Sequence, residues 1–213
     1  HARSLQLQFE LDRAQLEKQA VDARLALLTA QIEPHFLFNT LANVQELVET
    51  GSPRAGPVFQ SLIDYLRASM PRLNQSHATL GNEIALVRSY LELMSMRMPD
   101  RLTVRYALDA ALLPLRFPAM ALLTLVENAV RHGIDPSLRG GRIDVSVRLA
   151  AGRCTARVSD TGVGLQSGSQ GLGTGLQSLR ERLRLAWGDA AELRLSEVQP
   201  RGVAVEVEFP EQR

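Results

Sequence analysis

Residues 30–41 read AQIEPHFLFNTL, and they place a proline, an imidazole, two aromatic rings and an amide in a segment whose apolar spacing is helical. Proline inside a helix removes a backbone hydrogen bond and clashes with the preceding turn, at a cost of about 3 kcal/mol. Folding alone does not justify that cost. We therefore expect a functional reason for the arrangement, and His35 is the candidate residue.

Ahead of this stretch, apolar residues recur at alternating spacings of four and three, which predicts a two-stranded parallel coiled coil. The alternative is one long amphipathic helix that packs within its own chain. The seam positions are Leu7, Leu11, Ala14, Lys18, Val21, Leu25, Leu28 and Ile32.

The same heptad would bury His35 in the seam, where it could not meet a substrate. Pro34 ends the register and can turn the helix, so we expect an exposed His35 on a bent helix. That helix should run to about Glu49, before Gly51, and a second one should span residues 57–70. Two such hairpins would form a dimeric four-helix bundle.

The composition excludes several classes of protein and of binding site. The 213 residues carry 24 basic and 23 acidic side chains, a net charge of +1, which gives no electrostatic footprint for nucleic acid or a membrane surface. A single cysteine, Cys154, excludes an internal disulfide and a cysteine-based metal site. No apolar run approaches the roughly 18 residues of a membrane span. Because the chain starts inside a helical pattern, we expect it to be the soluble part of a longer protein.

The character of the chain changes after a third helix expected at residues 82–96. Strands and helices then alternate, which predicts an α/β sandwich with one mixed sheet covered by helices. We expect a domain of residues 1–72, with the coiled coil and hairpin, and a second domain of residues 73–213. The strands expected in the second domain are residues 102–108, 142–149, 153–160, 192–198 and 203–209, and its helices are residues 119–133 and 176–187.

The helix at residues 119–133 separates an apolar face from a polar one. An amide or carboxylate oxygen suits a hard cation such as Mg²⁺, and basic groups suit phosphate. A solvated polar face is the alternative interpretation. The polar face carries Thr124, Glu127, Asn128, Arg131 and His132.

Two glycine clusters follow. Asp160 ends a strand directly before Gly162 and Gly164, and a buried carboxylate there can accept a hydrogen bond from an exocyclic amine. Gly173 and Gly175 open the next helix, whose first backbone amides form a natural phosphate site. Each cluster alone is weak, because turns need glycine for structural reasons. Neither cluster fits a P-loop or a dinucleotide fingerprint.

Taken together and in this order, the motifs resemble the histidine-kinase ATPase domain of the GHKL superfamily. Residues 31–39, QIEPHFLFN, resemble the phosphoacceptor helix of LytS/YehU-type sensor histidine kinases, and residues 179–183, LRERL, resemble that family's segment after the lid. Two positions depart from the family pattern: Leu123-Thr124 stands where Gln-Pro is frequent, and Gly202-Val203 where Gly-Thr is. The lid, residues 165–172, is also short.

The resemblance implies an ATP- and Mg²⁺-dependent kinase in which His35 accepts the γ-phosphoryl group. Asn128 would ligate Mg²⁺, Arg131 and His132 would lie near the phosphates, and Asp160 would bind the adenine amine. The residues that would shape the pocket and its lid are Gly162, Gly164, Gly173 and Gly175.

Phosphoryl transfer to a neutral imidazole also needs a carboxylate that orients the ring. Glu127 is our candidate, with Glu33 as the local alternative. Asn39 lies one helical turn after His35, where it either positions a water for dephosphorylation or merely packs or caps.

We therefore expect a homodimeric protein-histidine kinase that passes its phosphoryl group to an aspartate of a response regulator. It would be the cytoplasmic portion of a bacterial inner-membrane sensor, tied to the membrane only through a region upstream of residue 1. The alternatives are a nucleotide-responsive dimeric scaffold without kinase activity, and a GHKL-type kinase acting on serine of another protein.

Overall fold

The computed structural model describes residues 34–69, 78–165 and 174–211. The chain divides into two compact units, residues 1–55 and 56–213, and each is described by itself. The predicted coiled coil, the bend ahead of His35 and the predicted boundary between residues 72 and 73 all lie outside the described residues.

Helix α2 (Pro34–Glu49) belongs to the first unit, and it ends where the sequence predicts. Gly51 adopts a φ of +63°, and its amide donates to the carbonyl of Val48 at 3.0 Å. The amide of Ser52 donates to the carbonyl of Leu47 at 2.8 Å. These two bonds satisfy the last carbonyls of the helix in the manner of a Schellman motif.

Helices α3 (Ala55–Ser69) and α4 (Leu80–Arg97) lie at the start of the second unit. The hydroxyl of Thr79 caps α4 by accepting from the amide of Asn82 at 3.2 Å. Tyr65 of α3 is buried, with its ring 5.9 Å from that of Tyr90 of α4. No helix in the described part of the chain is long and apolar enough to cross a bilayer.

A five-stranded mixed sheet forms the body of the second unit, in the order β2-β4-β5-β7-β6. Strand β2 is parallel to β4, and the other neighbours are antiparallel. The predicted strands are confirmed to within two residues at each end. The sequence did not predict the short ribbon of β1 (Ala78–Thr79) and β3 (Arg116–Phe117). The sheet strands are β2 (Leu102–Ala107), β4 (Gly141–Ala150), β5 (Arg153–Asp160), β6 (Glu192–Glu197) and β7 (Val203–Pro210).

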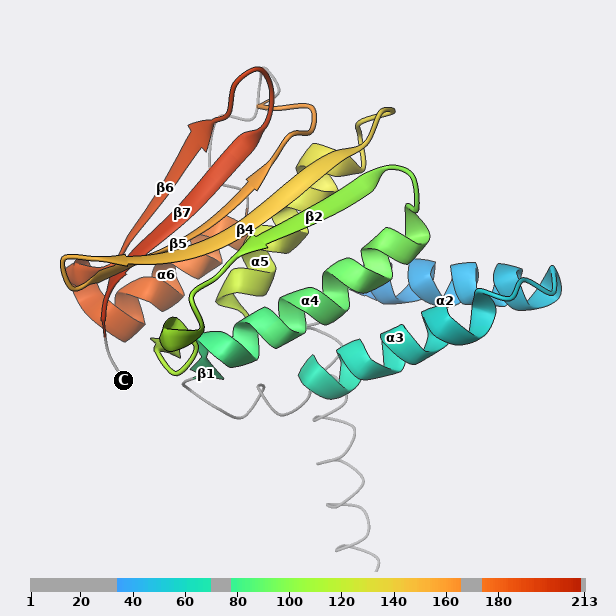
Figure 1. The fold of residues 1–213 in the computed structure, drawn as a ribbon, viewed down its shortest axis with the longest axis horizontal. Coiled ribbons are helices and arrows are strands. Elements are labelled where there is room, and N and C mark those ends of the chain that lie inside the picture. Colours follow the sequence, from blue (N-terminus) through green and yellow to red (C-terminus); the bar gives the residue numbers. More distant parts are fainter. Residues whose placement is uncertain (1–33, 70–77, 166–173, 212–213) are drawn as a thin grey trace, which may run out of the picture. The chain divides into compact units, whose positions relative to one another are not determined.

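Three helices cover one face of this sheet: α4, α5 (Ala121–Asn128) and α6 (Thr174–Trp187) (Figure 1). Alternating side chains of the strands point into the layer between sheet and helices, as the period of two in β5 requires. At one end of that layer the ring of Phe209 lies 5.1 Å from Phe117 and 4.9 Å from Trp187. This aromatic cluster joins α6 and β3 to the sheet.

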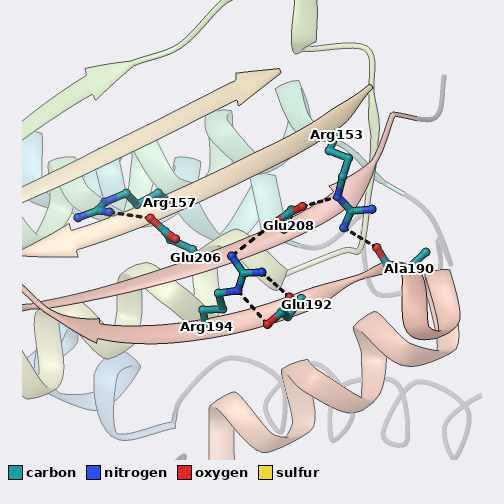
Figure 2. Close-up of polar contacts among 7 residues, drawn as sticks. All are labelled: Arg153, Arg157, Ala190, Glu192, Arg194, Glu206 and Glu208. Carbon is teal, nitrogen blue, oxygen red and sulfur yellow. Dashed lines mark hydrogen bonds and ion pairs between the residues drawn. The ribbon is translucent and has the colours of Figure 1, made fainter. Parts of the chain in front are cut away.

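The opposite face of the sheet carries charged side chains paired across strands (Figure 2). Arg157 of β5 pairs with Glu206 of β7 at 2.6 Å, and Arg153 pairs with Glu208. Arg194 of β6 lies 3.5 Å from the carboxylate of Glu208. Because these groups remain partly exposed, each pair stabilises the fold only slightly.

Candidate functional site

The helix that carries the predicted polar face changes its winding at Asn128. It is α-helical to that residue and continues as a π-helical turn, Ala129–Ile134, in which the amide of Asp135 donates to the carbonyl of Val130 at 2.8 Å. Such wide turns are rare and are frequently found at functional sites. Arg131 and His132 lie exposed on this turn.

The start of α5 is held by a buried carboxylate from α4. Glu83 is 0% exposed and accepts from the amides of Met120 at 2.9 Å and Leu122 at 3.1 Å. A negative charge at a helix N-terminus is favoured by the helix dipole. Met120 has a φ of +62°, a strained backbone that Glu83 helps to hold. The helix bearing Asn128 is therefore fixed at its first turn.

Asp160 lies at the end of β5 and is only 3% exposed. Its Oδ1 accepts from the amide of Gly162 at 2.8 Å. Burial raises the pKa of this carboxyl, and the backbone amides of Gly162 and Val203 act in the opposite direction. The carboxylate keeps further lone pairs for an amine donor, which is the role that the sequence predicts.

Three glycines around Asp160 are packed so closely that a side chain on any of them would not fit. A Cβ on Gly133 would clash with the Asp160 carboxylate, and one on Gly202 would clash with the Asp160 carbonyl. A Cβ on Gly162 would clash with the carbonyl of Gly133, which also accepts from the amide of Val163 at 3.1 Å. The end of the π-helical turn and the loop after β5 are thereby interlocked. Gly164, with a φ of +79°, follows in the same loop.

Gly175, in the first turn of α6, lies beside Asn128. A Cβ at this glycine would be 3.7 Å from Asn128 Nδ2 and 3.7 Å from Thr124 Cγ2. The Nδ2 atom is buried and has no hydrogen-bond partner among the described residues. A buried polar group of this kind calls for a partner such as a ligand or an ordered water. The Nδ2 group of Asn128 can therefore donate to an acceptor atom of a bound ligand, whereas a hard cation would need the side-chain oxygen Oδ1.

One helix thus connects both predicted motifs, since Asn128 adjoins Gly175 and Gly133 adjoins Asp160. Glu127 is half-buried, and its charge acts on the guanidinium of Arg182. Gly173 lies outside the described residues. Within residues 34–69, 78–165 and 174–211, no group of three His, Cys, Asp or Glu side chains could hold a metal ion.

The first unit contributes the predicted phosphoacceptor segment. The backbone of His35 belongs to the first turn of α2, and its side chain is outside the description. Asn39 is exposed one turn later on the same helix. The predicted roles of His35 and Asn39 stay predictions.

Sequence reasoning missed four residues that position this site: Glu83, Thr124 as an acceptor, Gly133 and Gly202. Glu83 left a readable signal, because it falls on the apolar face of its helix with Leu80, Ile84 and Val87, where a carboxylate needs partners. Gly133 and Gly202 left none, because their contacts come from segments far apart in the chain.

Comparison with known protein families covers most of the chain with two consecutive matches. A model described as histidine kinase matches residues 23–102. A model described as histidine kinase-, DNA gyrase B- and HSP90-like ATPase matches residues 116–213. The second match contains Asn128, Asp160 and both glycine clusters.

Two individual proteins are similar in sequence to this chain over most of its length. The sensor protein LytS of Staphylococcus haemolyticus is 30% identical over 199 residues, which cover 87% of this chain and 34% of that protein. The sensor histidine kinase BtsS of Escherichia coli is 31% identical over 182 residues, which cover 85% and 32%. The chain therefore spans about a third of the length of these relatives.

A solved structure, the histidine kinase domain of the Erythrobacter litoralis EL346 blue-light activated histidine kinase, is similar in fold. It superposes with a TM-score of 0.52 at 18% identity, over 94% of each chain. The likeness supports the predicted architecture of helices followed by a GHKL-type α/β domain with a mixed sheet.

Proposed function

This chain belongs to the histidine kinase family, and from that premise we propose that it uses ATP and Mg²⁺ to phosphorylate His35 and passes the phosphoryl group to an aspartate of a response regulator. The observation that carries the proposal is the buried Asp160 carboxylate, interlocked with the π-helical turn that directly follows Asn128, whose amide lies beside Gly175. An adenine amine at Asp160 and a phosphate chain near Asn128 would lie against neighbouring turns of one helix.

The proposed transfer forms one bond and breaks one. A ring nitrogen of His35 bonds to the γ-phosphorus while the bond from that phosphorus to the oxygen of ADP breaks. The proton on the other ring nitrogen passes to a carboxylate, for which Glu127 is the candidate and Glu33 the alternative. Mg²⁺ held by Asn128 would neutralise charge on the phosphates. Arg131 and His132, exposed on the π-helical turn, are placed in the proposal near those phosphates.

We also propose a homodimer and a place in a membrane sensor. Exposed apolar side chains support the dimer: Phe38 and Val48 of α2 are 70% and 63% exposed, and Phe59 of α3 is 48% exposed. The likeness to sensor proteins, of which the chain spans about a third, supports a cytoplasmic portion of a longer membrane-anchored protein.

Labelling decides between the kinase and its alternatives. The full 213-residue chain is incubated with γ-labelled ATP and Mg²⁺, beside His35→Gln. Acid-labile, base-stable label on the wild type and none on the variant is the expected result. Nucleotide binding without any label would favour the scaffold, and label on a partner with none on His35 would favour a serine kinase.

A second variant tests the carboxylate. Glu127→Gln should abolish labelling of His35 while the affinity for a fluorescent ATP analogue is retained, because the amide keeps the shape of the side chain and loses the base. Normal labelling of Glu127→Gln would exclude this role and direct attention to Glu33.

A further inference from the structure

Arg182 crosses from α6 to α5 and ends on two atoms at the start of that helix. Its Nη1 donates to the carbonyl of Ala119 at 2.8 Å, and its Nη2 donates to Thr124 Oγ1 at 3.1 Å. Its Nε is buried and has no hydrogen-bond partner within the described residues. Burial lowers the pKa of this guanidinium, opposed by the charges of Glu83 and Glu127. A buried cation costs free energy of desolvation unless well-placed hydrogen bonds and opposite charges compensate for the lost hydration.

Arg182 belongs to the face of α6 that packs against α5. Gly175, Leu179 and Arg182 are spaced four and three residues apart, so they lie on one face of the helix. Leu179 is 0% exposed. Gly175 adjoins Asn128 and Thr124, whereas Arg182, two turns later, reaches back to Ala119 and Thr124. The two helices therefore run antiparallel, with the first turn of α6 beside Asn128.

Thr124 supplies the side-chain acceptor of this contact. Its hydroxyl donates to the carbonyl of Met120 at 2.7 Å, which leaves its lone pairs for the guanidinium of Arg182. A proline, frequent at this position in the family, has no side-chain acceptor. Arg182 and Thr124 thus form a side-chain link between the helix that follows the lid and the helix that carries Asn128.

We propose that Arg182 is a positioning residue of the nucleotide site: its guanidinium holds α6 along α5 and so fixes the first turn of α6 beside the Asn128 amide. It acts through α6 and does not touch the nucleotide. The inference rests on the proposed function, because it requires that the wild-type chain itself binds nucleotide. Since the first turn of α6 directly follows the glycine-rich segment, its placement decides whether its amides and Asn128 meet the same ligand.

Amide hydrogen exchange of the nucleotide-free chain tests the positioning directly. Arg182→Met, which keeps the length of the side chain and removes its donors, should speed exchange in the first half of α6 by about tenfold, the size expected for losing hydrogen bonds from a charged group. Exchange in β4 and β5 should not change. Arg184→Met is the matched control, because Arg184 lies exposed on the same helix, and it should behave as the wild type.

Affinity for a fluorescent ATP analogue with Mg²⁺ gives the second readout. Arg182→Met should weaken it about tenfold, and Thr124→Val should weaken it less, with the double variant no worse than Arg182→Met alone. Thr124→Val also serves if Arg182→Met does not fold, since it keeps the bond from Arg182 to the carbonyl of Ala119 and removes only the two bonds of the Thr124 hydroxyl, to Arg182 and to the carbonyl of Met120. Wild-type exchange and affinity in either folded variant, or additive effects in the pair, would overturn the inference. A wild type that binds no nucleotide would instead refute the proposed function.

Discussion

On the outer face of the sheet, Arg157 and Glu206 pair through their side chains and remain 39% and 29% exposed, whereas on the helix side Glu83 is 0% and Asp160 3% exposed. The outer pairs bond side chain to side chain (Figure 2). The buried carboxylates bond chiefly to backbone amides, at Met120 and Leu122 or at Gly162.

The partly exposed outer pairs therefore contribute little to the fold, whereas the buried carboxylates hold neighbouring backbone segments in place. A partly exposed pair can exchange its partner for water at little cost. A buried carboxylate cannot, and each of its partners is therefore fixed in place. Four variants test this difference between the two sides of the sheet.

The largest effect on stability is expected for Glu83→Gln. The amide removes one of the two carboxylate charges, Glu83 and Glu127, that act on Arg182, and it presents its NH₂ group to the donors of α5. The free energy of unfolding should therefore fall by about 3–5 kcal/mol. Urea denaturation measures it. Glu92→Gln, at an exposed position of the same helix, is the control and should cost little. Equal losses in the two variants would contradict the assigned role of Glu83.

Gly162→Ala should come next. Its methyl group would clash with the carbonyl of Gly133, and such overpacking costs about 1–3 kcal/mol. The displaced loop should also weaken binding of a fluorescent ATP analogue. Gly56→Ala in α3 is the matched control, because nothing lies within 4 Å of the added carbon. That variant should be neutral or stabilised by up to about 1 kcal/mol, and comparable destabilisation of both would refute the predicted clash.

Asp160→Asn should separate stability from binding. Burial raises the pKa of Asp160, so the native state holds its proton more tightly than the unfolded chain does. The associated stability is present at low pH and is lost as the pH rises through the raised pKa. The variant does not titrate, so it should gain stability relative to the wild type between about pH 4 and about pH 7.

Nucleotide affinity of the same variant should fall about tenfold or more, because the amide NH₂ faces the adenine amine instead of an acceptor. Urea midpoints at the two pH values and titration with the fluorescent analogue measure the two effects. Asp144→Asn, paired with Arg142 on the outer face, should leave the affinity unchanged. A stability difference that shrinks as the pH rises would contradict the effect assigned to burial.

The smallest effect is expected for Arg157→Gln on the outer face. Removing one side of a partly exposed pair should change the free energy of unfolding by less than about 1 kcal/mol, and by still less at high salt. Thermal unfolding with and without added salt measures it. A loss as large as that of Glu83→Gln would remove the contrast between the two faces.

Much of this architecture was predictable because its signals are local. The period of two in residues 153–160 and the apolar spacing of residues 82–96 are read without knowledge of neighbours. The resemblance of the motifs, in their order, to a known family predicts one site for Asn128, Asp160 and Gly175. Contacts among segments distant in sequence could not be read this way: the clash that makes Gly202 necessary arises against Asp160, and the acceptor for Arg182 lies on Thr124.

The order of the sheet has a consequence for how the molecule folds. Leu102 pairs with Gly141, and Ser159 pairs with Ala204, so α5 and α6 each lie within a loop closed by a non-local strand pairing. Local hairpins form readily, while closing such loops costs chain entropy and slows folding. Asn128 and Gly175 should therefore meet only at a late step. A chain arrested with its β4–β5 and β6–β7 hairpins alone would carry every motif of the site and bind nothing.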